Sequence, residues 1–253
     1  MFLKDNLVSR VAITLYRVAF RFPKKIFFQN NDDKALFLKK RIVSKQACGL
    51  LPGSGINTDD FSASPRNRHG KKFTFLLISR LIYDKGILEY VEAINSMKDQ
   101  GIDAKFQLLG QIDEKHKRGI PASVVQEWIE KSQVEYLGTT DDVRTFIEQA
   151  DCVVLPSYRE GTPKTLLEAA SMAKPIVATD VPGCKNVVMD GKNGYLCKVK
   201  DSGDLAEKMK LLYHQKPSTL EKMGKFSRAY IKESFEENIV IGKYLSAIDK
   251  ITL

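Results

Sequence analysis

The sequence predicts an α/β protein with a doubly wound, mainly parallel, Rossmann-like sheet, and three observations support this prediction. From residue 73 onward, strand-like and helical segments alternate at a spacing typical of βαβ units. The strand-like segments are short and apolar throughout, as expected of strands that helices cover on both faces. A polar, turn-rich stretch over residues 57–72 indicates a linker that separates this region from a basic N-terminal segment.

The N-terminal segment begins with an amphipathic helix over residues 7–22, whose apolar residues recur at helical spacing between arginines. Residues 25–29 form a short strand. Asp32 or Asp33 can cap the next helix, which ends near Lys40.

The following elements are predicted from apolar runs, helical periodicity and turn residues. Strands are expected at residues 73–79, 105–109, 134–137, 152–155, 176–179 and 194–197. Helices are expected at residues 86–98, 122–131, 141–149, 163–173, 202–214, 218–233 and 236–250. Right-handed crossovers between such parallel strands give a doubly wound sheet. Sheets of this kind bind ligands at the carboxyl ends of their strands, so functional residues are expected directly after each strand.

The net charge of +9 is unevenly distributed. Residues 1–41 carry ten Lys/Arg and three Asp, hence +7, which leaves +2 for the rest of the chain. A basic end on a near-neutral body favours contact with an anionic membrane surface, and a solvated basic face is an equally good interpretation. We expect no nucleic-acid partner, because no recognisable binding module accompanies the basic residues.

The four cysteines form no C-x-x-C pair and the three histidines are scattered, so we expect neither a metal site nor another cofactor. This cysteine usage favours a reducing cytosol. No apolar run approaches the roughly 20 residues of a spanning helix, and the N-terminus does not resemble a signal peptide. We expect a cytoplasmic protein, and a peripheral location at the inner face of the membrane is one of the two interpretations of its basic end.

A first candidate site follows the strand at 73–79. Arg80 and Lys85 place two cations before a helix that starts near Gly86, where free backbone N–H groups favour an anion. Cations are unfavourable at a helix N-terminus unless a bound anion such as a diphosphate offsets them. The alternative is two solvated charges in a turn.

A second candidate site follows the strand at residues 152–155. Gly161 allows close approach of a ligand, Thr162 is a good N-cap, and Pro163 suits the first helical position. Glu160 precedes this helix and Glu168 lies on its second turn within an apolar run, where an acid needs a partner. Two carboxylates there suit the hydroxyls of a sugar or ribose. The alternative is a turn acid and an exposed helix acid.

A third candidate is the turn at residues 179–184 (TDVPGC), which follows the strand at 176–179. We interpret it as a structural turn.

Several motifs together resemble the C-terminal domain of the retaining GT-B glycosyltransferases of the "glycosyl transferases group 1" type. The resemblance is carried by FFQNNDDKALF (27–37), LLPGSGINTDDF (50–61), FLLISRLIYDKG (75–86), FQLLG (106–110), VEYLG (134–138), VLPSYREGTPKTLLEAASMAKPIVATDVPGC (154–184) and DGKNGY (190–195). It extends from about residue 24 to the end of the chain, and is closest to bacterial enzymes of capsule, exopolysaccharide and O-antigen assembly. One small departure is Ala173, where glycine is usual.

The resemblance implies a role for each matching residue. Arg80 and Lys85 would hold the donor's diphosphate and stabilise the leaving group, and Glu160 would contact the donor sugar. Glu168 would bind the ribose, and Gly138 and Thr139 would cradle the base. The N-terminal end of the helix at 163–173, called here the helix mouth, would bind the sugar hydroxyls and phosphate through Gly161, Thr162, Pro163, Lys164, Thr165 and Leu166. We thus expect catalytic roles for Glu160, Arg80 and Lys85, without a metal.

The resemblance also implies a division of the chain. Residues 1–56 would be a remnant of the N-terminal acceptor domain with the linker, 57–233 the nucleotide-sugar-binding domain, and 234–253 the crossover helix. The family's Gly-rich loop and catalytic-region histidine have no counterpart here. We therefore expect either that a separate N-terminal half is a partner or that the chain is a truncated product, and in both cases that the closing helix has little to pack against.

The implied function is that of a retaining hexosyltransferase. It would transfer sugar from a nucleotide-sugar, expected to be a UDP-sugar, to a lipid-linked or polysaccharide acceptor. The alternative is a non-catalytic nucleotide-sugar-binding fragment. A UDP-sugar epimerase would need other acids and histidines, and an NAD-dependent dehydrogenase is disfavoured because no G-x-G-x-x-G follows a strand.

Overall fold

A computed structural model describes residues 7–63, 71–131 and 133–252. Its main body contains a parallel sheet of six strands in the order β5-β4-β3-β6-β7-β8. These strands are β3 (Phe73–Ile78), β4 (Ala104–Leu109), β5 (Glu135–Tyr136), β6 (Cys152–Leu155), β7 (Ile176–Thr179) and β8 (Gly194–Cys197). The predicted doubly wound fold is confirmed, and the strand positions agree closely with those expected.

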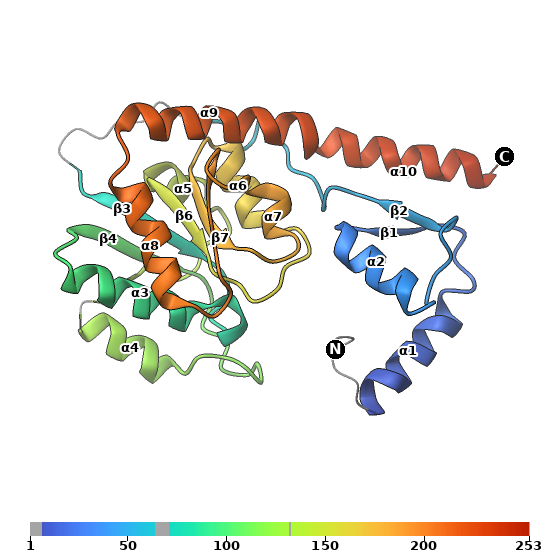
Figure 1. Cartoon of the computed structure of the whole chain (residues 1–253), viewed down its shortest axis with the longest axis horizontal. Helices are drawn as coiled ribbons and strands as arrows, with labels where there is room; N and C mark the ends of the chain where they lie inside the picture. The colour runs from blue at the N-terminus through green and yellow to red at the C-terminus, as the bar shows by residue number, and fades with distance from the viewer. Residues whose placement is uncertain (1–6, 64–70, 132, 253) are drawn as a thin grey trace.

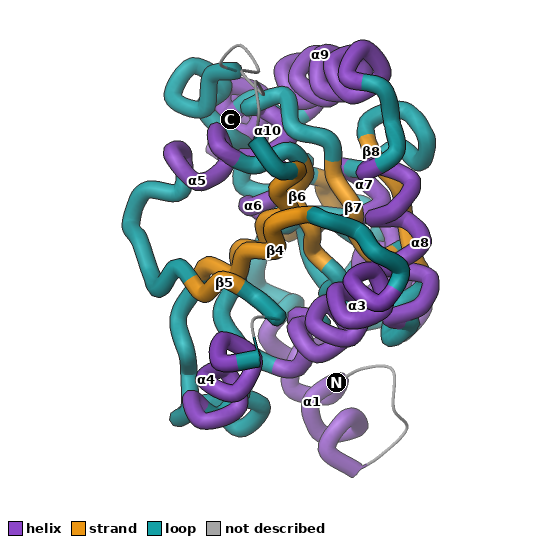
Figure 2. The backbone as a smooth tube through the Cα atoms, turned by 90° about the vertical axis from the view of Figure 1, so that its left-hand side faces the viewer, coloured by secondary structure: helices purple, strands orange, loops and turns teal. Residues whose placement is uncertain are grey.

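Helices cover both faces of this sheet (Figures 1 and 2). They are α3 (Ile87–Asp99), α4 (Ala122–Glu130), α5 (Arg144–Gln149), α6 (Lys164–Ser171), α7 (Cys184–Val187), α8 (Ser202–Tyr213) and α9 (Pro217–Ser234), while α10 (Glu237–Thr252) follows α9 and extends beyond this sheet (Figure 1). Along β6, Cys152 and Val154 join the core beneath α3, α4 and α8, while Val153 and Leu155 join the core beneath α6. The uniformly apolar strands are therefore explained by two cores, one on each face.

A smaller N-terminal unit (residues 7–50) lies beside the main body (Figure 1). It comprises α1 (Leu7–Ala19), β1 (Ile26–Phe28), α2 (Asn31–Lys39) and β2 (Cys48–Leu50), with β1 and β2 paired in parallel. Asn30, and not Asp32 or Asp33, caps α2, because its Oδ1 accepts a hydrogen bond from the Asp33 N–H at 2.7 Å. The expected cap was wrong because the chain is still extended at Asn30 and turns into the helix directly after it.

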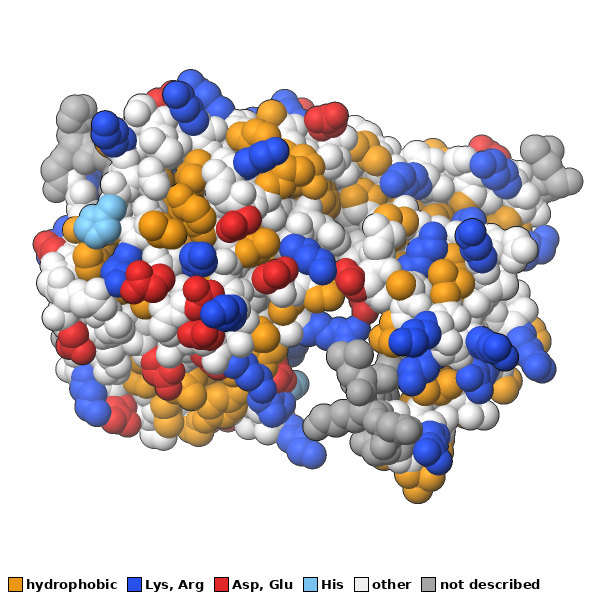
Figure 3. Space-filling view, in the orientation of Figure 1, with side chains coloured by type: hydrophobic (Ala, Val, Ile, Leu, Met, Phe, Trp, Pro, Cys, Tyr) orange, Lys and Arg blue, Asp and Glu red, His pale blue; other side chains and the backbone are white. Residues whose placement is uncertain are grey.

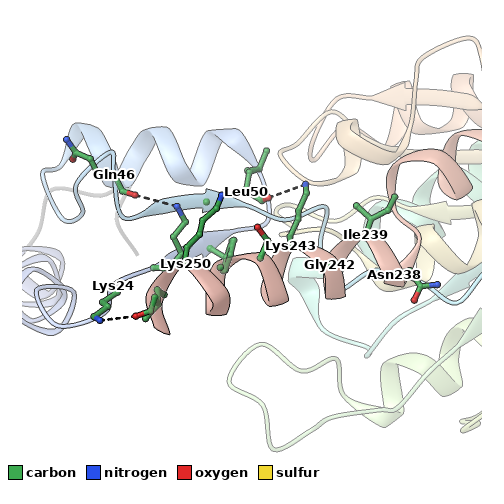
Figure 4. A pocket seen from close by; sticks show the side chains of 14 residues that line it. Lys24, Gln46, Leu50, Asn238, Ile239, Gly242, Lys243 and Lys250 are labelled. Carbon is green, nitrogen blue, oxygen red and sulfur yellow. Dashed lines mark hydrogen bonds between the residues drawn. The ribbon is translucent and has the colours of Figure 1, made fainter. Parts of the chain in front are cut away.

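The closing helix α10 packs on the β1–β2 sheet, contrary to the expectation that it would find little to pack against. The rings of Tyr244 and Phe27 meet edge to face at 5.1 Å between centroids. Lys243 Nζ donates to the Leu50 carbonyl at 3.4 Å, and Lys24 Nζ donates to the Ile251 carbonyl at 3.3 Å. A groove of about 600 Å³ remains between the helix and the sheet (Figure 4).

The predicted linker at 57–72 is only partly within the described residues, since 64–70 lie outside them. Its first part packs on α9. The guanidinium of Arg228 donates to the carbonyl of Thr58 at 3.1 Å and to that of Phe61 at 3.0 Å. These residues therefore belong structurally to the main body.

Lys and Arg side chains gather over the N-terminal unit (Figure 3), as the charge distribution predicts. The apolar residues of α1 are exposed, with 77% of Leu7 and 65% of Leu15 accessible. No helix in the described part of the chain is long and apolar enough to span a bilayer. Across residues 7–63, 71–131 and 133–252, no cluster of three or more His, Cys, Asp and Glu side chains could hold a metal ion.

Candidate functional site

The order of the sheet reverses between β3 and β6, which are direct neighbours. Loops that follow two such strands diverge and leave a crevice at their carboxyl ends, where open α/β sheets bind ligands. The two loops also contact each other. Gly86, at φ +71°, lies so close to Pro156 that a Cβ would be 2.1 Å from the Pro156 carbonyl oxygen, and Tyr158 N–H donates to Asp84 O at 2.9 Å. The first two candidate sites are thus brought together.

Lys85 and Glu160 form the contact at the centre of this edge. Lys85 ends a single 3₁₀ turn (Tyr83–Lys85), and its Nζ lies 2.5 Å from Glu160 Oε1. Their side chains are 24% and 11% exposed, so the ion pair is partly shielded from water. Arg80 is directed elsewhere, because its guanidinium pairs with Asp113 at 3.6 Å and its side chain is 56% exposed.

The mouth of α6 differs from the expected capping arrangement. Pro163 occupies the N-cap position and Lys164 begins the helix, which has no side-chain cap. Thr162 is not the cap, because the chain is still extended at Pro163 and the Thr162 hydroxyl instead donates to the Gln29 carbonyl at 3.3 Å. First-turn N–H groups without a side-chain cap can bind an anion.

Thr165 and Leu166, the next predicted binding residues on α6, are both engaged in contacts within the protein. Thr165 Oγ1 donates to Ile78 O at 3.4 Å, which ties the helix to the end of β3. Leu166 is fully buried in the core and its N–H donates to Pro163 O, so its side chain is not presented to the crevice.

Glu168 is buried, as its apolar neighbours suggested, and has the partner that an acid in this place requires. Lys164 Nζ lies 3.5 Å from its Oε1, one helical turn earlier, and the Glu168 side chain is 8% exposed. Burial raises the pKa of Glu168, and the Lys164 ammonium partly opposes this increase. A carboxylate kept in such surroundings is unfavourable for stability and is therefore a candidate for function.

Gly138 and Thr139 follow β5, at the same edge but on the outer side of β4. The Gly138 carbonyl accepts the Gly110 N–H at 2.8 Å, which holds the loops after β5 and β4 together. Gly138 has φ +75° and open space where a side chain would project. The strand order places these residues apart from the Lys85–Glu160 pair along the carboxyl edge of the sheet.

The turn at 179–184 is structural, as interpreted, but it also borders the site. Thr179 Oγ1 donates to the carbonyl of Ser157. Gly183 has φ +85°, and a Cβ there would lie 2.1 Å from the Gly161 carbonyl oxygen. Burial, with a smaller contribution from the nearby Glu160 carboxylate, raises the pKa of the Cys184 thiol. No turn motif in the sequence indicated that this segment would press on the Glu160 loop.

Two further sets of residues that hold the loop after β6 were not predicted from the sequence. Tyr158 OH donates to Glu89 Oε1 at 2.6 Å and thereby anchors the loop after β6 to α3; burial and this carboxylate raise the pKa of the Tyr158 phenol. Gln29, Asn30 and Asp33 of the N-terminal unit also contact the Glu160 loop. No sequence signal could have found these contacts, because they join segments more than a hundred residues apart.

Comparison with known proteins identifies similar sequences. The sequence model described as "Glycosyl transferases group 1" matches residues 59–230. The N,N'-diacetylbacillosaminyl-diphospho-undecaprenol alpha-1,3-N-acetylgalactosaminyltransferase of Campylobacter jejuni is 29% identical over 98% of this chain and 66% of its own length. The capsular polysaccharide biosynthesis glycosyltransferase CapM of Staphylococcus aureus is 24% identical over 76% of this chain and 52% of its own. This chain therefore spans about half to two thirds of these relatives.

Solved structures share the fold. A glycosyltransferase from Rickettsia africae superposes with a TM-score of 0.83 at 19% identity, over 96% of this chain and 67% of that one. Anabaena Alr3699/HepE, solved in complex with UDP-glucose, superposes with a TM-score of 0.81 at 19% identity, over 95% of this chain and 67% of that one.

Proposed function

Because this chain belongs to the glycosyl transferases group 1 family, we propose that it forms the nucleotide-sugar-binding part of a glycosyltransferase. The observation that carries this proposal is the convergence of Lys85, Glu160 and the open mouth of α6 at the switch point of the sheet. A cation, a carboxylate and free helix N–H groups can together hold a phosphorylated polyol.

In this proposal, Lys85 binds the donor's diphosphate and stabilises the negative charge that develops on the leaving nucleotide. An ammonium has three N–H donors, so Lys85 can keep its bond to Glu160 while it binds a phosphate oxygen. The Arg80 side chain is 56% exposed and its pair with Asp113 is long, at 3.6 Å, so in this proposal Arg80 turns toward the same diphosphate. No metal is needed in this scheme, because the two cations supply the positive charge.

Glu160 accepts hydrogen bonds from the donor sugar, and the α6 mouth from Gly161 to Thr165 binds sugar hydroxyls and phosphate. Glu168, directly inside the helix, accepts hydrogen bonds from the ribose. Gly138 and Thr139 cradle the base from the neighbouring loop. The sheet supports this arrangement in so far as Gly138 and Thr139 follow β5, Lys85 follows β3 and Glu160 follows β6, so all of them lie at the same edge of the sheet.

We propose a UDP-sugar as donor and a lipid-linked or polysaccharide acceptor. Anabaena Alr3699/HepE binds UDP and UDP-glucose, which supports the donor class. The Campylobacter relative and an Escherichia coli relative, "UDP-Gal:alpha-D-GlcNAc-diphosphoundecaprenol alpha-1,3-galactosyltransferase" (24% identical over 68% of this chain and 46% of its own), support the acceptor class. Retention of configuration follows from the family resemblance alone.

The N-terminal unit is proposed to be part of the acceptor domain, with residues 57–233 as the donor domain and 234–253 as the crossover helix. The packing of α10 on the β1–β2 sheet supports the crossover. The exposed apolar side of α1, interleaved with Arg10 and Arg17, suits either an anionic membrane surface or further protein, such as a separate N-terminal half.

Calorimetry with UDP tests the site. UDP should bind, and Lys85→Ala or Glu168→Ala should weaken binding at least tenfold, about 1.4 kcal/mol. Lys72→Ala is the matched control, because Lys72 precedes β3 at the opposite end and forms an exposed pair with Asp103. Equal UDP affinity in all three variants would overturn the site assignment, and saturable binding without sugar transfer would support the non-catalytic alternative.

A further inference from the structure

Asn30 is almost fully buried, with 1% of its surface exposed, at the junction of β1 and α2. Its Oδ1 accepts the Asp33 N–H at 2.7 Å, and this bond fixes which way the side-chain amide faces. Its Nδ2 then donates to Asp33 Oδ2 at 3.0 Å and to the Gly161 carbonyl at 3.2 Å. Capping alone requires only an oxygen, so the amide nitrogen performs a second task across the two parts of the molecule.

The same segment holds the residues on either side of Glu160. Asp33 forms an ion pair with Arg159, which directly precedes Glu160. The Gln29 carbonyl accepts the Thr162 hydroxyl at 3.3 Å. Residues 159, 161 and 162 are thus each bonded to residues 29–33 of the N-terminal unit, and Glu160 itself points toward Lys85 at 2.5 Å.

Two glycine turns also pack closely against this loop. A Cβ on Gly183 would lie 2.1 Å from the Gly161 oxygen, and a Cβ on Gly53 would lie 2.7 Å from Thr162 Cβ. The Gly161 carbonyl is therefore packed against the Gly183 turn and is also bonded to the Asn30 amide. This carbonyl shares a peptide plane with the Thr162 N–H, so turning it would change the direction of that N–H next to Glu160 and the start of α6.

We propose that Asn30 is a positioning residue for the donor-sugar subsite: from the N-terminal unit, it orients the Gly161 peptide and so the Glu160 loop. This inference rests on the proposed function for the identity of the ligand. Asn30 does not itself contact the donor. It makes the sugar-contacting loop dependent on the docking of the N-terminal unit, while the nucleotide contacts at Lys85 and Glu168 remain within the main body.

Asn30→Ser tests this proposal, because serine caps a helix about as well as asparagine but cannot reach Gly161. Asp201→Ser is the matched control, since Asp201 caps α8 through its bond to the Asp204 N–H at 2.8 Å, away from the site. Calorimetry with UDP and UDP-glucose should show that the loss of UDP-glucose affinity in Asn30→Ser is at least fivefold larger than any loss of UDP affinity through the phosphate contacts of the same loop. Both affinities should change less than twofold in Asp201→Ser. Equal weakening of the two ligands, or no change in either, would overturn the positioning role.

Hydrogen–deuterium exchange of the full chain separates this inference from the proposed function. A peptide covering residues 157–167 should exchange at least tenfold faster in Asn30→Ser than in the unchanged chain or in Asp201→Ser. Unchanged exchange there refutes the positioning role even if UDP binds. Faster exchange together with no binding of UDP or UDP-glucose by the unchanged chain supports the positioning role and refutes the proposed function.

Discussion

Substitution of the two charges at the centre of the site should separate nucleotide binding from sugar binding. Lys85→Met removes the partner of a carboxylate that is only 11% exposed. Loss of one partner of a fully buried pair costs about 3–5 kcal/mol of unfolding free energy. Because Lys85 itself is 24% exposed, solvent offsets part of this, and we expect a loss of about 2 kcal/mol. The loss of a charge-assisted bond to a diphosphate, about 1.5–3 kcal/mol, should weaken UDP binding at least tenfold.

Glu160→Gln should behave differently. Glutamine has nearly the same shape as glutamate but no negative charge, so the Lys85 ammonium is no longer paired with a carboxylate. UDP affinity should therefore be unchanged or higher, while the affinity for UDP-glucose relative to UDP should fall. Urea unfolding and calorimetry on both single variants and the double variant complete a cycle, with an expected coupling of roughly 1–2 kcal/mol in stability. The assignment of Lys85 to the diphosphate is refuted if Lys85→Met leaves UDP affinity intact, and the division of roles is refuted if Glu160→Gln weakens UDP as much as Lys85→Met does.

Three further predictions concern stability. Burial raises the folded-state pKa of Glu168 above the ordinary 4.5, so the folded state binds more protons than the unfolded state and stability falls as pH rises through that window. Glu168→Gln should remove this loss of stability. Above pH 4.5 the Tm of the variant should then change less with pH than the Tm of the unchanged chain, and the same pH dependence of Tm in both proteins would contradict the prediction. Gly183→Ala places a Cβ 2.1 Å from backbone at φ +85° and should cost about 3 kcal/mol in urea unfolding, whereas a neutral effect would show that the turn can move. Tyr244→Ala removes the ring contact with Phe27 and should cost about 1 kcal/mol and speed proteolysis of the N-terminal unit, while unchanged proteolysis would show that α10 does not hold that unit.

The strands of the main body were predictable because their signal is local. An apolar run such as residues 152–155 is bounded by turn residues, and it forms a buried strand wherever helices cover both faces. The proximity of two candidate site residues was predictable for a similar reason. Lys85 and Glu160 each follow a strand, and the rule that ligands bind at the carboxyl edge of parallel strands places both at one edge without knowledge of the contacts.

The errors occurred where a local rule competed with a distant contact. Thr162 has the composition of an N-cap, yet its hydroxyl bonds to the Gln29 carbonyl. The pair that Arg80 forms with Asp113 at 3.6 Å was likewise not expected, and the proposed role of Arg80 at the diphosphate stays a prediction. Neither partner can be identified from the sequence, because the acceptor that a side chain contacts depends on interatomic distances that exist only in the folded chain.

The sequence by itself therefore determined the doubly wound sheet, the family to which the chain belongs and the loops that carry the candidate site, since each depends on residue order over short spans. Only the tertiary structure decided how that site is held. The docking of the β1–β2 unit and α10 brings Asn30 onto the Gly161 carbonyl, and the Gly183 turn packs closely against the same carbonyl. The physical reason is that hydrogen bonds and close packing between distant segments depend on distances of a few tenths of an ångström, and no pattern along the chain encodes them.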